Sequence, residues 1–161
     1  MIEKTITINY KVYSSINELS VNDRELVSNA KLVADNAYAP YSQFHVGAAV
    51  RMSNGRIISA SNQENAAFPS GLCAERIAIF YAQSLLPKVA IDTIAIVAKQ
   101  DGIITNDVTY PCAACRQVMY EAQLRGKKPI RVIMVSEGKI EVVESIDSLL
   151  PFSFNNLSGV E

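Results

Sequence analysis

The sequence lacks any run or stripe of basic residues, and its formal net charge at pH 7 is only −1. Without such a surface a polyanion is a poor partner, so we expect no binding to nucleic acid. The sequence also lacks an apolar run long enough to span a bilayer, and it shows no basic and apolar leader at its N-terminus. We therefore expect no membrane partner and a cytoplasmic location.

Cysteine is scarce as well, and the three that occur are Cys73, Cys112 and Cys115. Three cysteines cannot all pair within one chain, and in a reducing cytosol metal binding explains them better than disulfide formation. Histidine occurs once, as His45 in an alternating apolar stretch. An exposed strand residue is a better interpretation of His45 than a metal ligand.

Hydrophobic residues, by contrast, make up 49% of the 161 residues, which is enough for one domain with a buried core. Strand-like and helix-like patterns alternate along the chain without a linker or a repeat. We therefore expect a single α/β domain over residues 1–161, a three-layer sandwich with helices on both faces of a mixed sheet of roughly five strands. Within it we separate an N-terminal extension, residues 1–20, from a core of residues 22–154.

Local patterns predict the strands. An Asn-Gly pair at residues 54–55 lies between two apolar stretches and predicts a hairpin. The apolar stretches at 91–98, 130–135 and 140–143 predict further strands. Alternating apolar residues between positions 6 and 12 predict one more, half-buried strand, added at an edge of the sheet. Packing between subunits is one interpretation of this strand, and a simple cover for the sheet edge is the one we expect.

Helices are expected at three places. Asn22-Asp23 offers a cap for the first helix, the second begins at about Cys73, and the third begins at Cys112 or Ala113.

Three thiolates can hold a zinc ion and leave its fourth position open to water, which distinguishes a catalytic zinc site from a structural one. Cys112 and Cys115 close a short loop, whereas Cys73 lies far from them along the chain. Both groups are expected at helix N-termini, whose partial positive charge lowers the pKa of a thiol. We therefore expect Cys73, Cys112 and Cys115 to hold one Zn²⁺.

Glu75 lies two residues after Cys73, within possible reach of a water on that zinc. Positions two apart in a regular helix diverge by about 200°, so the two side chains converge only if Cys73 is a cap residue. Arg76 and Arg116 follow Cys73 and Cys112 at helical spacings of three and four. Either arginine can donate to a ligand sulfur and draw off negative charge.

Two other interpretations of the cysteines stay open at this point. Cys112 and Cys115 are also typical of a redox pair or of half a structural zinc knuckle. A redox pair leaves Cys73 and Glu75 without a role, and a knuckle needs a fourth ligand that the sequence does not offer.

Four stretches carry a resemblance to a known family: FHVGAA at 44–49, NQENA at 62–66, CAER at 73–76 and PCAACRQV at 111–118. In order and spacing they resemble the motifs of the small homotetrameric zinc-dependent cytidine deaminases, over about residues 22–154. The zinc nucleoside deaminase signature, with cysteine in place of its histidine, is part of this resemblance.

The resemblance implies that Cys73, Cys112 and Cys115 bind zinc and that Glu75 is the general acid/base. It implies hydrolytic deamination of cytidine and 2′-deoxycytidine to uridine and 2′-deoxyuridine in pyrimidine salvage, with release of ammonia. Zinc-activated water would attack C4 of cytosine. Glu75 would protonate N3 and then the departing amino group.

It also implies contacts to the substrate. Asn62 and Glu64 would grip a ribose hydroxyl, Phe44 would pack on the pyrimidine, and the backbone N–H of Ala74 would meet the base carbonyl. Without the resemblance, Asn62 and Glu64 fit an ordinary polar loop better, and Phe44 is simply an inward strand residue.

The same resemblance implies that Ala66 reaches the sugar of a neighbouring subunit and that Phe154 closes over a neighbouring site. We therefore expect a homotetramer whose sites lie at subunit interfaces. Three departures stand out: Phe68 replaces a tyrosine expected near the 5′-hydroxyl, Ala113 replaces a glycine, and residues 1–20 exceed the usual start.

Two further functions stay open. The zinc chemistry could act on a modified pyrimidine nucleoside or a nucleoside antibiotic, or the chain could be a non-catalytic, zinc-stabilised module that binds nucleosides or a protein. Glu75 counts against the module, which would not need it.

Overall fold

A computed structural model describes residues 1–155 of the chain. Its helices and strands, in chain order, are β1 (Lys11–Tyr13), α1 (Val21–Val33), β2 (Phe44–Met52), β3 (Ile57–Ser61), α2 (Ala74–Leu85), β4 (Ile91–Gln100), β5 (Ile103–Ile104), α3 (Ala113–Gly126), β6 (Arg131–Val135) and β7 (Ile140–Val143). Short 3-10 helices cover Ile16–Glu18, Ala34–Asn36, Phe68–Ser70 and Ile146–Ser148. Among the described residues, no helix combines the length and apolar character needed to cross a bilayer.

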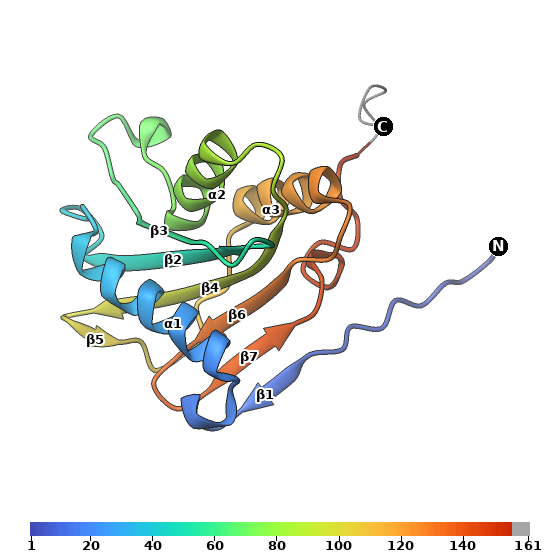
Figure 1. Cartoon of the computed structure of the whole chain (residues 1–161), viewed down its shortest axis with the longest axis horizontal. Coiled ribbons are helices and arrows are strands. Elements are labelled where there is room, and N and C mark those ends of the chain that lie inside the picture. Colours follow the sequence, from blue (N-terminus) through green and yellow to red (C-terminus); the bar gives the residue numbers. More distant parts are fainter. Residues whose placement is uncertain (156–161) are drawn as a thin grey trace.

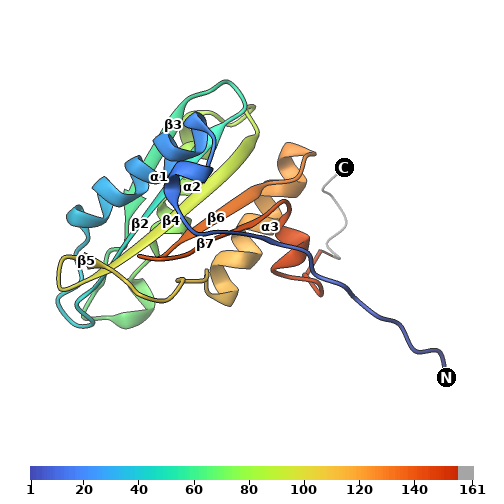
Figure 2. The same cartoon turned by 90° about the horizontal axis from the view of Figure 1, so that it is seen from below.

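The seven strands form one mixed sheet in the order β1-β7-β6-β4-β2-β3, with β5 paired to β4. Helix α1 covers one face, and α2 and α3 cover the other (Figures 1 and 2). Alternate residues of β4 serve the two layers: Ile94 and Ile96 pack in the core with α2 and α3, whereas Ala95 and Val97 pack in the core with α1. The expected three-layer sandwich is therefore confirmed, and β2, β3, β4, β6 and β7 are its five expected strands.

The connections bring the starts of α2 and α3 to the same end of the sheet. β3 and β4 are both antiparallel to β2, so they run in the same direction, and β6 is parallel to β4. Helix α2 is thus the crossover between β3 and β4, and α3 the crossover between β4 and β6. Both helices begin beyond the carboxyl ends of strands, the end at which open α/β sheets bind ligands.

Close approach of α1 to the sheet depends on Gly47 in β2, where a Cβ would collide with the carbonyl oxygen of Ala30. The expected hairpin at residues 54–55 is present, and Gly55 supplies its positive φ of 85°. The predicted cap of α1 at Asn22-Asp23 is wrong by two residues. Ser20 is the N-cap, because its Oγ accepts a hydrogen bond from the Asp23 N–H.

The N-terminal strand is shorter than the alternation predicted. Only Lys11–Tyr13 pairs with the sheet, antiparallel to β7, so the expectation of an edge strand holds for these three residues. The predicted burial of its apolar face is wrong, because within residues 1–155 the alternating side chains Ile6, Ile8, Tyr10 and Val12 remain 53%, 48%, 56% and 54% exposed.

Candidate active site

The three cysteine sulfurs converge where α2 and α3 begin. Their Sγ atoms all lie within 4.8 Å of one another, and those of Cys112 and Cys115 are 3.4 Å apart. Cys73 and Cys112 are the N-cap residues of α2 and α3, with extended backbone (ψ of 151° and 165°), and neither sulfur caps its helix. Cys115 lies in the first turn of α3 and is buried. Both predicted helix starts are therefore confirmed.

This donor set suits a zinc ion. Tetrahedral Zn–S bonds of about 2.3 Å place ligand sulfurs about 3.8 Å apart, close to the spacing of these three. None of the three is in a disulfide. His45, half-buried on β2, is not part of the group, so within residues 1–155 the cluster offers three protein ligands.

The sulfurs do not share charge equally. Cys73 accepts hydrogen bonds from the Cys115 thiol and from the Arg76 guanidinium. These hydrogen bonds outweigh the effect of burial and lower the pKa of Cys73 to about 5. The pKa of Cys115 is raised, because Cys115 gives that hydrogen bond, is buried, and faces the charge of Glu75. The pKa values of this coupled pair are therefore shifted in opposite directions.

Glu75 is the second residue of α2 and is only 5% exposed. Burial raises the pKa of its carboxyl, and the neighbouring Cys73 raises it further. The extended backbone of Cys73 removes the helical divergence that would otherwise separate the two side chains. A buried carboxyl with a raised pKa beside three sulfurs holds a proton more readily than an exposed carboxyl does, which suits it to proton transfer.

Arg76 and Arg116 use their guanidinium groups differently. Arg76 donates from Nη2 to Cys73 Sγ at 3.8 Å, and its buried Nε has no partner within the described chain. Arg116 instead donates to two backbone carbonyls, Nε to Pro111 at 2.8 Å and Nη1 to Leu149 at 3.0 Å. Charge relief on sulfur therefore comes from Arg76, while Arg116 ties the start of α3 to the C-terminal segment.

An open cleft of about 520 Å³ begins at the sulfur site. Cys73 and Arg76 form part of its wall, and the loop between β3 and α2 supplies much of the rest. Asn62, Glu64 and Phe68 line it. The cleft thus joins a metal-binding group to a rim of amide, carboxylate and aromatic side chains, which is a suitable shape for a small polar ring compound.

Residues 20–128 match the family model described as the cytidine and deoxycytidylate deaminase zinc-binding region. The chain belongs to this zinc-dependent deaminase family. A cytidine deaminase of Sporosarcina psychrophila is 36% identical over 131 residues, 81% of this chain and 90% of the relative. One from Halalkalibacterium halodurans is 43% identical over 100 residues, 62% of this chain and 71% of the relative.

Solved structures of cytidine deaminases align with most of this chain. The cytidine deaminase of Burkholderia pseudomallei aligns with a TM-score of 0.71 at 37% identity, covering 81% of this chain and 97% of that one. The enzyme of Mycobacterium tuberculosis aligns with a TM-score of 0.66 at 29% identity, covering 84% and 99%.

In this deaminase, the side chain of Asn62 makes two hydrogen bonds to the backbone of strand β2. Its Oδ1 accepts from the N–H of Val46 at 2.7 Å, and its Nδ2 donates to the carbonyl of Phe44 at 2.9 Å. Phe44 is half-buried and packs against the core on the α2 and α3 side. Asn62 therefore fixes the backbone on both sides of His45, at the end of the strand that carries Phe44.

Glu64 is held by the loop before β2. Its Oε2 accepts from the N–H groups of Tyr41 at 2.9 Å and Ser42 at 3.3 Å. A hydrogen bond from Ser42, with these backbone bonds, lowers the pKa of the carboxyl despite partial desolvation. Glu64 is thus an ionised acceptor on the cleft rim. Tyr41 also packs edge-on against Phe68, with ring centroids 5.6 Å apart.

The remaining predicted residues lie around this site. Ala74 opens α2, in the first turn where backbone N–H groups lack intrahelical acceptors. Ala66 is exposed in the loop before α2. Ala113 is helical, so the Cβ that replaces the expected glycine costs no strain.

Sequence reasoning missed Gln117, which holds the C-terminal tail. Its Nε2 donates to the carbonyl of Phe154 at 2.9 Å, and its Oε1 accepts from the Phe154 N–H at 3.2 Å. The ring of Phe154 is left exposed. No local signal predicts this pair, because the two residues are 37 positions apart, although Gln117 belongs to the same motif as Arg116.

Proposed function

We propose that this deaminase converts cytidine and 2′-deoxycytidine to uridine and 2′-deoxyuridine by hydrolysis, with release of ammonia, in pyrimidine salvage. The observation that carries the proposal is the buried Glu75 beside a three-sulfur cluster at the end of an open cleft. Three protein ligands leave one zinc position for water, as a hydrolytic site requires.

Cys73, Cys112 and Cys115 would hold the zinc. When bound, the ion lowers the pKa of a water towards about 7 and thereby supplies a nucleophile at neutral pH. Glu75 would take a proton from the attacking water and deliver it to N3 of the base. It would then take the proton from the hydroxyl formed at C4 and pass it to the amino group, which leaves as ammonia while the C4 carbonyl forms. Arg76 keeps negative charge on Cys73 in check, which preserves the electrophilic character of the site.

The substrate contacts follow from how each side chain is already occupied. Glu64 uses Oε2 for two backbone bonds, so we assign Oε1 to a ribose hydroxyl. Both polar atoms of the Asn62 side chain, Oδ1 and Nδ2, make hydrogen bonds to β2, so we assign Asn62 chiefly to positioning Phe44 against the base. The second lone pair of Oδ1 remains available to the sugar. The Ala74 N–H is assigned to the base carbonyl.

We further propose that the enzyme is a homotetramer in which Ala66 and Phe154 contact the site of a neighbouring subunit. Both residues are exposed in the single chain, as such a role requires. The cytoplasm is the proposed compartment, because zinc binding needs all three sulfurs reduced.

The test is a substrate profile on zinc-loaded protein. Cytidine and 2′-deoxycytidine should lose the long-wavelength part of the cytosine absorbance as the uracil band replaces it, and should release one equivalent of ammonia, whereas cytidine monophosphate should react poorly. The Cys115→Ser variant should bind less zinc and lose activity in parallel. If the fully zinc-loaded protein leaves both nucleosides unchanged, the proposal fails, and turnover of a modified pyrimidine nucleoside alone would redirect it to that substrate.

A further inference from the structure

The segment before β1 is an extended arm, here defined as residues 1–10 (Figures 1 and 2). It has no secondary structure, and within residues 1–155 none of its side chains makes a hydrogen bond. The arm leads directly into β1, the end strand of the sheet, whose outer edge has no neighbour in the described chain. An unpaired strand edge offers backbone donors and acceptors to another extended chain.

Side chains of the arm alternate between apolar and polar along the sequence. Continued in strand geometry through β1, even positions from Ile6 to Val12 share one face and are all apolar or aromatic, and odd positions share the other and are polar. The even side chains are about half exposed, as quoted above. Such a pattern is typical of a strand with one covered face, yet within residues 1–155 about half of the surface of these side chains stays open to solvent.

We propose that the arm pairs with the arm of a second copy of this chain, as antiparallel strands about a two-fold axis at Thr7. Antiparallel pairing of identical segments is isologous, so both copies satisfy the same contacts. Any register that places even residues opposite even residues keeps the apolar faces together. The register centred on Thr7 does so, and it places Ile6 opposite Ile8 and Lys4 opposite Tyr10.

Charge selects this register among the alternatives. Centring on Thr7 puts Glu3 of one copy opposite Lys11 of the other, on the polar face, and opposite charges at facing positions stabilise a strand pair. Lys11 is well placed for this contact, because its ammonium is exposed and, within residues 1–155, contacts one carboxylate, Glu144, at 2.7 Å. A centre one pair earlier or later, at Ile6 or Ile8, brings Glu3 opposite Asn9 or Tyr13 and loses the ion pair.

The pairing also covers the free edge of the sheet. With Glu3 opposite Lys11, the chain of the second copy runs beside β1, and the two sheets become continuous through their arms. Ten arm residues contribute to this contact, and none lies at the sulfur site. The contact is therefore independent of the chemistry proposed above.

Cysteine placement tests the register directly. Facing residues in an antiparallel pair have Cα atoms about 4.5–5.5 Å apart, which a disulfide can bridge. Thr7→Cys should therefore cross-link to its own copy under mild oxidation, giving a dimer band on a non-reducing gel, about tenfold above Thr5→Cys. Thr5→Cys is the matched control, because two such residues would be about 13 Å apart along the strands. The double variant Thr5→Cys/Asn9→Cys should cross-link again.

Wild-type protein gives the background from the native cysteines. Adding Ile8→Asp to Thr7→Cys should lower the dimer yield, whereas adding Asn9→Asp, on the polar face, should leave it unchanged. Equal cross-linking of Thr7→Cys and Thr5→Cys, or a Thr7→Cys protein that behaves as wild type, would overturn the proposal. So would indifference of the yield to Ile8→Asp.

Discussion

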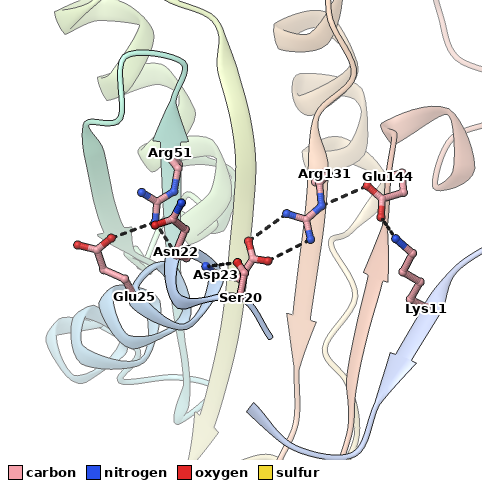
Figure 3. Close-up of polar contacts among 8 residues, drawn as sticks. All are labelled: Lys11, Ser20, Asn22, Asp23, Glu25, Arg51, Arg131 and Glu144. Carbon is pink, nitrogen blue, oxygen red and sulfur yellow. Dashed lines mark hydrogen bonds and ion pairs between the residues drawn. The ribbon is translucent and has the colours of Figure 1, made fainter. Parts of the chain in front are cut away.

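Two clusters of charged groups lie in different parts of the fold, and they shift the pKa values of their carboxyl groups in opposite directions. At the sulfur site, burial raises the pKa of Glu75, and Arg76 keeps a buried Nε without a partner. At the other cluster, Asp23, Arg131, Glu144 and Lys11 form a chain of ion pairs across α1, β6, β7 and β1 (Figure 3). There each charge has an opposite charge beside it.

The pKa directions express this contrast. Hydrogen bonds from Arg131 and Ser20 outweigh burial at Asp23 and lower its pKa, and the hydrogen bond from Lys11 lowers the pKa of Glu144. The ion-pair cluster thus favours the charged forms, whereas burial at Glu75 disfavours the charged form. Groups held away from their preferred protonation state serve chemistry, and groups held in it serve stability. The two clusters should therefore respond to mutation in different observables.

The largest effect is expected for Glu75→Gln. The amide keeps the size of the side chain but cannot carry the proton, so kcat should fall by about 10³-fold while zinc content stays near one per chain. Steady-state kinetics with cytidine and a colorimetric zinc assay measure the two quantities. A variant with full turnover would remove Glu75 from the mechanism, and a variant that loses zinc would make it a ligand or a support of the ligands.

Next in size is Arg76→Gln, which removes the only guanidinium that contacts a ligand sulfur among the described residues. Zinc affinity or kcat should fall by about 10–100-fold, as is usual when a partner of a metal ligand is lost. Competition with a chelator separates affinity from kcat, and Arg76→Lys should recover part of the loss. Arg116→Gln, by contrast, should lower stability more than it lowers zinc affinity, since its donors go to Pro111 and Leu149.

This contrast between the two arginines shows how far sequence reasoning reached. Spacing placed both on the faces of their cysteines, and local patterns predicted helix starts at about Cys73 and at Cys112 or Ala113, because these depend on neighbours in sequence. It did not predict which acceptor a long side chain reaches, because Leu149 is 33 positions from Arg116. Carbonyls brought near by the fold compete with sulfur, and no local pattern encodes them.

Other misses have the same physical origin. Ser20, Asn22 and Asp23 are all good cap residues, and only the backbone geometry at Ser20 decides among them. The hairpin at residues 54–55 was predictable because its turn residues determine it locally. The alternation in the arm correctly indicated an extended chain, but a period of two cannot say what covers the apolar face.

A smaller effect, on stability rather than activity, is expected for Arg131→Met. It leaves Asp23, a largely buried carboxylate, without its 3.0 Å partner, which should cost about 2 kcal/mol of unfolding free energy. Arg51→Met is the matched control, because its partner Glu25 lies on the same helix as Asp23 but is exposed, and such pairs contribute about 0–1 kcal/mol. Urea unfolding measures both, and zinc content and kcat should stay unchanged. Equal losses in the two variants would refute a special role for the cluster.

The smallest effect is a pH dependence of that stability. Because folding lowers the pKa values of Asp23 and Glu144, their contribution is present above the ordinary values near 3.8 and 4.5 and is lost as pH falls through the lower, folded values. Zinc release at low pH destabilises every variant, so the informative quantity is the difference between wild type and Arg131→Met. That difference should be constant near neutrality and should shrink below about pH 4. A difference that stayed constant on acidification would mean that Arg131 stabilises the fold through its packing rather than through these two carboxylates.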